Sequence, residues 1–229
     1  MVDLIATLTP DAVAGNLARI REEIAAAGRD PATVEILAAI KYLPADLLPA
    51  LAQGGVKTVG ENRAQRLAVT QDAYPNLFPR WDFIGTLQSR KVKDLLGRVR
   101  YIHSVASESA LAQIARHRAS ARPGLEVLIE VNVAGEQSKS GIDPADLSRY
   151  LERCALPVAG LMTMPPQTAT SGGNRRHFAA LRELAGAHGL TQLSMGTSQD
   201  YLDAIREGAT IVRLGTTLYR SRESRGGAA

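Results

Sequence analysis

Short apolar segments alternate with amphipathic ones along almost the whole chain, and this alternation constrains the fold more than any other feature. Eight segments have the length and apolar content of strands buried on both faces, at residues 34–41, 57–60, 81–85, 101–105, 125–133, 158–162, 192–196 and 211–215. Helical patterns lie between and after them, at residues 44–55, 64–73, 89–96, 107–121, 144–154, 175–188, 200–207 and, over a shorter stretch, 217–225. Such alternation favours right-handed βαβ units and a parallel sheet. Eight units predict an α/β protein with a closed (β/α)8 TIM barrel, and a doubly wound open sheet is the alternative.

One more helical pattern precedes the first predicted strand. Thr9 and Pro10 suit an N-cap and a first-turn proline, and apolar residues recur every three or four positions from Leu17 to Ile24. The length of 229 residues is one at which an α/β barrel forms one domain, about 200–250 residues. We therefore expect a single domain over residues 1–229, with an extra N-terminal helix at about residues 9–28 and the barrel at about residues 34–225.

Composition narrows the setting of the protein. A single cysteine, Cys154, excludes an internal disulfide and a cysteine-based zinc site, which favours a reducing, cytoplasmic location. No apolar run reaches the ~18 residues of a membrane span, and the first residues lack the pattern of a signal peptide. The net charge is +4, and the basic residues are scattered among acidic ones. We expect no nucleic-acid or membrane partner, and a small anionic ligand suits this charge well.

The carboxyl ends of the strands are where a barrel of this kind carries its functional groups. Lys41 ends the first predicted strand and follows an apolar run at residues 36–40. Apolar surroundings disfavour the ammonium, and a neutral lysine amine is the form that attacks an aldehyde. Lys41 is therefore a candidate for Schiff-base formation. The alternative is a lysine that simply extends from a strand end into solvent.

The last two predicted strands both run into small polar residues. The sequence is Ser-Met-Gly-Thr-Ser at residues 194–198 and Arg-Leu-Gly-Thr-Thr at residues 213–217. Loops after these two strands often hold a phosphate, because glycines let backbone N–H groups approach and hydroxyls add donors. Arg213 lies two residues before Gly215, so strand alternation places both on one face. The pattern predicts a phosphate site with a guanidinium beside it.

A set of seven motifs carries a resemblance to a known family. They are residues 39–41 (AIK), 60–62 (GEN), 81–91 (WDFIGTLQSRK), 138–141 (SKSG), 160–162 (GLM), 193–198 (LSMGTS) and 212–216 (VRLGT). From about Ile36 to Tyr219 the sequence resembles the pyridoxal phosphate homeostasis family, whose members look like the N-terminal barrel of alanine racemase without its second domain. The resemblance implies that fold and a pyridoxal 5'-phosphate cofactor. Tyr42, Asp82 and Arg90 depart from the family pattern, which often has a small hydroxyl residue, a histidine and an asparagine there.

The resemblance also implies one cofactor site without a metal, built from Lys41, Asn62, Ser194, Gly196, Arg213, Gly215 and Thr216. Lys41 would hold the cofactor as a Schiff base, and Asn62 would line the site near the ring. Three residues would bind the phosphate, namely Ser194, Gly215 and Thr216, with Gly196 shaping their loop. Arg213 would face the pyridine nitrogen. A cation there opposes protonation of that nitrogen and weakens the ring as an electron sink.

Three functions suit such a site. The first is a protein without enzymatic turnover that carries or buffers pyridoxal phosphate through Lys41, in vitamin B6 and amino-acid homeostasis, with transient transfer to enzymes that use it. The second is an amino-acid racemase or decarboxylase. A racemase needs two bases, and the resembled racemases take one from a second domain for which the chain leaves no room after Tyr219. The third is a Schiff-base aldolase, which usually has its lysine on a later strand. We favour the carrier and expect a monomer, because the racemases dimerise through that second domain.

Overall fold

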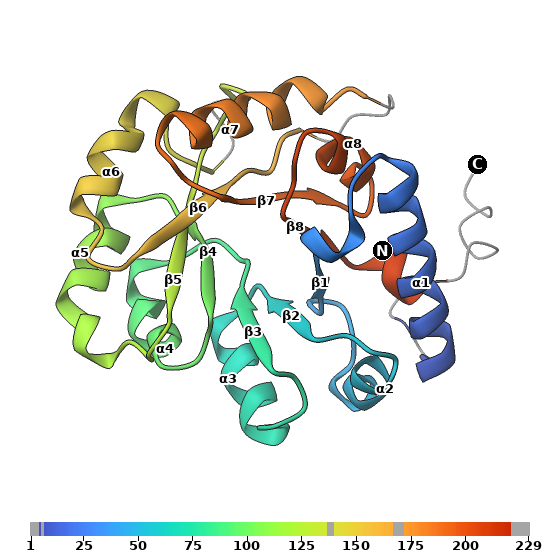
Figure 1. Cartoon of the computed structure of the whole chain (residues 1–229). Helices are drawn as coiled ribbons and strands as arrows, with labels where there is room; N and C mark the ends of the chain where they lie inside the picture. Colours follow the sequence, from blue (N-terminus) through green and yellow to red (C-terminus); the bar gives the residue numbers. More distant parts are fainter. Residues whose placement is uncertain (1–4, 6, 137–139, 167–171, 221–229) are drawn as a thin grey trace.

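A closed barrel of parallel strands forms the centre of the molecule (Figure 1). The computed structural model describes residues 5, 7–136, 140–166 and 172–220. Within them the barrel strands, in chain order, are β1 (Glu35–Ala39), β2 (Thr58–Glu61), β3 (Arg80–Phe83), β4 (Tyr101–Val105), β5 (Glu126–Glu130), β6 (Val158–Met162), β7 (Gln192–Thr197) and β8 (Ile211–Leu214). β1 pairs with both β2 and β8, which closes the sheet. The predicted (β/α)8 barrel is confirmed, and the open sheet is wrong.

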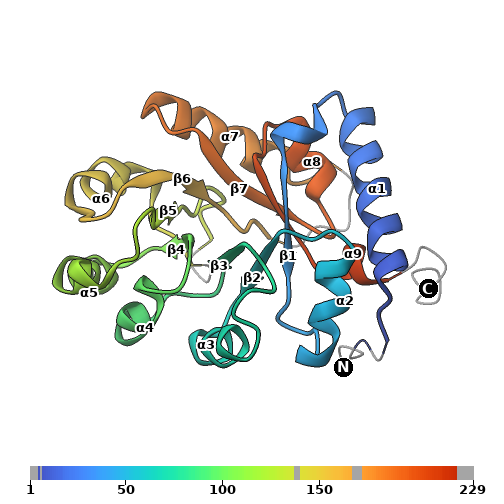
Figure 2. The same ribbon diagram turned by 60° about the horizontal axis from the view of Figure 1, so that its bottom comes forward.

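Helices surround the barrel on its outer side (Figure 2). They are α1 (Pro10–Ala26), α2 (Leu48–Gln53), α3 (Ala64–Ala73), α4 (Val92–Leu96), α5 (Glu108–His117), α6 (Leu147–Arg153), α7 (Arg175–Ala187), α8 (Tyr201–Arg206) and α9 (Thr216–Tyr219). Several helices predicted from the sequence are longer than the α-helices in the structure. The predicted ranges also include short 3₁₀ turns, such as Ala45–Leu47 before α2 and Arg118–Ser120 after α5. Residues 221–225 of the last predicted helix and residues 138–139 of the fourth motif lie outside the described residues.

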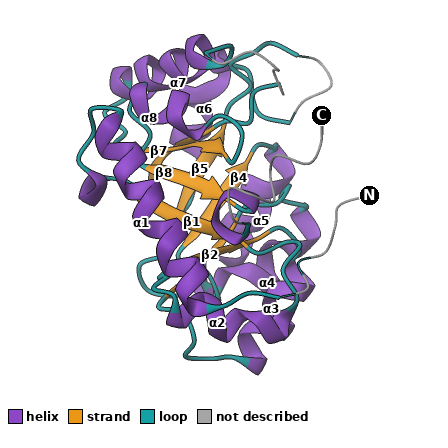
Figure 3. Cartoon of the chain, turned by 90° about the vertical axis from the view of Figure 1, so that its right-hand side faces the viewer, coloured by secondary structure: helices purple, strands orange, loops and turns teal. Residues whose placement is uncertain are grey.

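The extra N-terminal helix is confirmed as α1, and it packs against α2, α8 and α9 (Figure 3). Thr9 is its N-cap, and the Thr9 hydroxyl accepts the backbone N–H of Ala12 at 3.3 Å. Asn16 is buried and donates to the carbonyl of Leu218 at 3.0 Å. α9 is only one turn long, and α1 packs against both α9 and α8, the helix that contacts β8.

The two sides of the strands differ in chemistry. Apolar side chains fill the layer between the strands and the helices. The barrel interior instead contains buried polar side chains, which include Asp82, His103, Glu130, Ser194 and Arg213. The interior of such barrels is usually filled with branched apolar residues, so this polar core needs a functional or structural reason. Among the described residues, no helix combines the length and the apolar character that a membrane crossing requires.

Candidate ligand-binding site at the carboxyl end of the barrel

A cavity of about 430 Å³ opens where the strands run out into their following loops. Its wall takes residues from the ends of β1, β2, β3, β6, β7 and β8. Six of the seven site residues expected from the sequence line it, namely Lys41, Asn62, Gly196, Arg213, Gly215 and Thr216. The seventh, Ser194, does not. The fold therefore gathers residues that lie up to 175 positions apart in the chain, Lys41 to Thr216, around one space (216 − 41 = 175).

Lys41 lies in a turn two residues beyond the end of β1. Its side chain is exposed, and its ammonium nitrogen lies 4.8 Å from the centroid of the Tyr42 ring, a cation–π distance. The sequence had suggested an apolar setting at the strand end. The tertiary structure instead presents the amine at the open mouth of the cavity, where a ligand carbonyl can reach it.

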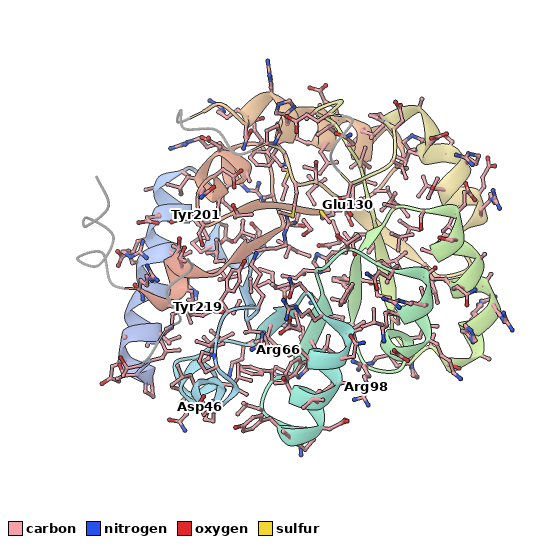
Figure 4. All side chains as sticks on the ribbon, turned by 180° about the vertical axis from the view of Figure 1, so that it is seen from behind. Asp46, Arg66, Arg98, Glu130, Tyr201 and Tyr219 are labelled. Carbon is pink, nitrogen blue, oxygen red and sulfur yellow. The ribbon has the colours of Figure 1, made fainter. Side chains whose placement is uncertain are left out.

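Arg66, which is labelled in Figure 4, and Glu61 brace the turn that carries this lysine. The Arg66 guanidinium donates to the carbonyl of Ile40 at 2.8 Å and also to the carbonyl of Leu43. Glu61 is fully buried and accepts from Arg66 at 2.6 Å, while its other carboxylate oxygen accepts the backbone N–H of Asn62 at 2.7 Å. Sequence reasoning placed Glu61 in a motif but missed Arg66, since nothing in the local pattern of α3 marks it.

Replacing Arg66 by glutamine is expected to lower the free energy of unfolding by about 1–3 kcal/mol, because Glu61 then keeps a buried charge without its cation. Denaturant unfolding measures this loss. The double variant Arg66→Gln/Glu61→Gln removes both charges and should recover part of the stability. A double variant that is no more stable than Arg66→Gln alone would contradict the stabilising role of the ion pair between Arg66 and Glu61.

Gly196 fixes the course of the chain at the end of β7, just before the loop that follows. Its φ angle is +92°, a conformation that residues with a side chain rarely adopt. A Cβ atom added there would lie 2.6 Å from the Cβ of Ala204 and 3.0 Å from the Cα of Tyr201. Only glycine therefore lets this loop turn while α8 packs directly against it.

Ser198 joins the loops after β7 and β8. Its hydroxyl oxygen accepts the backbone N–H groups of Gly215 at 3.1 Å and Thr217 at 3.2 Å. The hydroxyl hydrogen stays available for a further acceptor. At Gly215 an added Cβ would meet only the carbonyl oxygen of Ala39, at 3.7 Å, so packing does not require a glycine there. The absence of a side chain leaves space in the cavity. Hydroxyl groups around such a space suit an anion, and Ser198 Oγ holds the two loops in place around it.

Ser194 lies elsewhere, and its expected place among the phosphate donors has to be corrected. It is fully buried, and its hydroxyl oxygen lies 2.6 Å from Arg213 Nη1 and 2.8 Å from His103 Nδ1. Within β7 its side chain points into the barrel below the cavity. Ser198, at the other end of the same motif, is past the strand and reaches the mouth. Strand alternation alone would place both serines on one face, because they are four residues apart. The end of β7 at Thr197 separates them.

Arg213 forms the floor of the cavity and is only 5% exposed. Its guanidinium donates to the carbonyls of Ser194 at 2.7 Å and Thr163 at 3.0 Å. Burial lowers the pKa of Arg213 to about 10, although the charges of Glu130 and Asp200 favour its protonated form. Arg213 is thus a buried cation at neutral pH, held from below by carbonyl groups.

These features define a class of protein: a (β/α)8 barrel with an exposed lysine, an anion loop and a buried arginine around one cavity. The family model of the alanine racemase N-terminal domain matches residues 8–223. Pyridoxal phosphate homeostasis proteins from Pseudomonas aeruginosa and Aquifex aeolicus are 41% and 39% identical to this chain, each over 90% of it and over 92% and 95% of their own lengths. The structure of PipY from Synechococcus elongatus with PLP bound is 30% identical, with a TM-score of 0.78, and the match covers 91% of this chain and all of that one.

The chain therefore belongs to the pyridoxal phosphate homeostasis protein family, within the proteins that share the alanine racemase N-terminal domain. This membership confirms the family expected from the sequence motifs.

Proposed function

We propose that this chain binds pyridoxal 5'-phosphate in the cavity and carries or buffers it through a Schiff base to Lys41, in vitamin B6 and amino-acid homeostasis. One observation carries the proposal: an accessible primary amine, an anion loop and a buried cation line the same space. These groups match the aldehyde, the phosphate and the ring of the cofactor. The PLP-bound PipY structure and the names of the curated relatives support it.

Lys41 forms and breaks the bond to the cofactor. When bound, the cofactor would supply an aldehyde, the Lys41 amine would bond to its carbon, and the aldehyde oxygen would leave as water. Addition of water reverses the reaction and releases the cofactor. The brace between Arg66 and Glu61 holds the turn so that the amine stays at the mouth of the cavity.

The remaining site residues bind and orient. The hydroxyl of Ser198 and the loops shaped by Gly196 and Gly215 receive the phosphate, with Thr216 beside them. Ser198 takes the place that the sequence had assigned to Ser194. Arg213 would face the ring nitrogen, and Asn62 would lie near the ring, since both line the cavity.

Two features favour a carrier over a racemase or decarboxylase. The cationic Arg213 opposes protonation of the ring nitrogen and so weakens the stabilisation of a carbanion. Tyr219 lines the cavity, but burial raises the pKa of its hydroxyl, which makes it a poor second base. Family membership also speaks against the sugar-phosphate aldolase.

We also propose that the protein acts in the cytoplasm as a monomer with one domain and passes its cofactor transiently to pyridoxal phosphate-dependent enzymes. The single cysteine supports a reducing compartment. In the part of the chain that the structure describes, large exposed apolar side chains are limited to Tyr42, Val69 and Met164. Such a surface offers little apolar area for a permanent partner. Size-exclusion chromatography with light scattering measures the oligomeric state directly.

Titration with pyridoxal phosphate tests the proposal. We expect one equivalent to bind with the visible absorption of a Schiff base, and a panel of amino acids in D₂O to show no faster α-carbon exchange than with free cofactor. Protein that stays colourless and binds no cofactor would refute the proposed ligand. Rapid exchange that requires Lys41 would instead identify an enzyme.

A further inference from the structure

A chain of buried polar side chains crosses the barrel interior behind Arg213. The links are Arg213 Nη1 to Ser194 Oγ at 2.6 Å, Ser194 Oγ to His103 Nδ1 at 2.8 Å, and His103 Nε2 to Asp82 Oδ2 at 3.2 Å. Arg100 closes the far end with two bonds to Asp82, at 2.6 and 3.1 Å. The members come from β8, β7, β4 and β3, and β4 and β7 are not neighbours in the sheet, so the chain runs through the interior.

We call these four linked side chains, Arg213, Ser194, His103 and Asp82, the relay. Their protonation states follow from their surroundings. Burial alone would raise the pKa of Asp82, but hydrogen bonds from His103 and Arg100 outweigh it and leave the pKa below its ordinary value. Burial lowers the pKa of His103. The hydrogen bond and the charge of Asp82 oppose this shift, the charges of Arg213 and Arg100 support it, and the pKa stays below its ordinary value. The carboxylate is therefore ionised and the imidazole neutral.

One direction of donation results. An ionised carboxylate only accepts, so His103 carries its proton on Nε2 and donates to Asp82. Nδ1 is then an acceptor, and the Ser194 hydroxyl donates to it. The Ser194 oxygen in turn accepts from Arg213. Every link thus points from Arg213 toward the negative charge of Asp82, and such a chain polarises cooperatively.

This arrangement holds Arg213 without neutralising it. In the described part of the chain no carboxylate forms an ion pair with Arg213, although Glu130 is near enough to favour its charge. A direct ion pair would turn the guanidinium toward its partner and compensate its charge locally. The relay ends at the Asp82 carboxylate, two side chains away and itself ion-paired with Arg100, so the guanidinium keeps its cationic face toward the cavity.

We propose that Asp82, His103 and Ser194 are positioning residues that fix the orientation and the charge of Arg213 toward the bound cofactor ring. The inference rests on the proposed function, because it concerns how that same site sets the electronic state of its ligand. It also gives a role to Ser194, which the sequence had placed at the phosphate.

Asp82→Asn is the first test, with Glu207→Gln as the matched control. Glu207 is also buried, although at 7% exposed against 0% for Asp82. It pairs with two arginines, Arg175 at 2.6 Å and Arg182 at 2.8 Å, and lies outside the cavity. We expect Asp82→Asn to weaken pyridoxal phosphate binding roughly tenfold, as loss of a charge-assisted bond does, and to shift the absorption band of the bound cofactor. Glu207→Gln should change neither. Equal effects of both variants would overturn the positioning role.

A double-mutant cycle separates positioning from general destabilisation. If Asp82 acts through Arg213, Asp82→Asn should change the affinity less than about twofold in an Arg213→Lys background. The same loss in both backgrounds would overturn the proposal. Ser194→Ala cuts the relay in the middle without touching a charge, and it should reproduce the band shift even where Asp82→Asn folds poorly.

Nitrogen-15 NMR of the histidine side chains reads the relay without any cofactor. We expect His103 to be the neutral Nε2–H tautomer, assigned by its loss in His103→Gln, and to change tautomer in Asp82→Asn. A protonated or Nδ1–H imidazole would overturn the relay. Because this measurement uses the protein alone, it tests the relay independently of the proposed function. The relay can be wrong although the cofactor binds, and it can be right although the cofactor does not bind.

Discussion

Alanine in place of Lys41 is expected to abolish the visible absorption of the bound cofactor and to leave ligand that dialysis removes. Lys41 is the lysine that lines the cavity in the described structure, and without its amine no bond to the aldehyde forms. Borohydride reduction followed by peptide mass measurement detects the adduct directly. In the unchanged protein it should sit on the peptide that contains Lys41.

Lys57→Ala is the matched control for this experiment. Lys57, like Lys41, is exposed and lies near the end of a barrel strand. It comes just before β2, at the opposite end of the barrel from the cavity. Its variant should keep both the absorption and the reduced adduct. An adduct that persists at full yield in Lys41→Ala would show that another amine carries the cofactor.

Gly196→Ala is expected to have the largest effect on stability among the site variants. The backbone angle of +92° costs a residue with a side chain about 1–3 kcal/mol, and the overlap with Ala204 adds about 1–3 kcal/mol more. Relaxing that overlap moves the loop after β7 away from α8. The preference for pyridoxal phosphate over pyridoxal should then shrink by at least about tenfold, because it depends on charge-assisted bonds to the phosphate.

Gly28→Ala separates the two causes. Gly28 has a similar φ of +85°, but an added Cβ would meet nothing within 4 Å. This variant should lose only about 1–2 kcal/mol of stability, the cost of the backbone angle, and keep its full preference for the phosphorylated ligand. Denaturant unfolding and paired binding titrations give both quantities. Equal losses of stability in the two variants would show that the contact with α8 does not matter.

Strand and helix patterns are local, and this is why the barrel could be predicted. The spacing of apolar residues identified each strand of the barrel and favoured closure, and the observed pairing of β1 with β8 excluded the open sheet. Element ends were less predictable. The first strand stops at Ala39 rather than at Lys41, because the chain turns as soon as the cavity mouth begins.

The sequence by itself determined the eight strands and their helices, the extra helix, the resemblance to the family and the set of loops that meet around the cavity. These depend on periodicity and on motifs that are continuous in the chain. Only the tertiary structure decided which serine faces the cavity and which faces the interior, because that depends on where β7 ends. It also brought Arg66 to the turn of Lys41, and His103 between Asp82 and Ser194. Those contacts join distant strands, and no local pattern encodes a distance across the barrel.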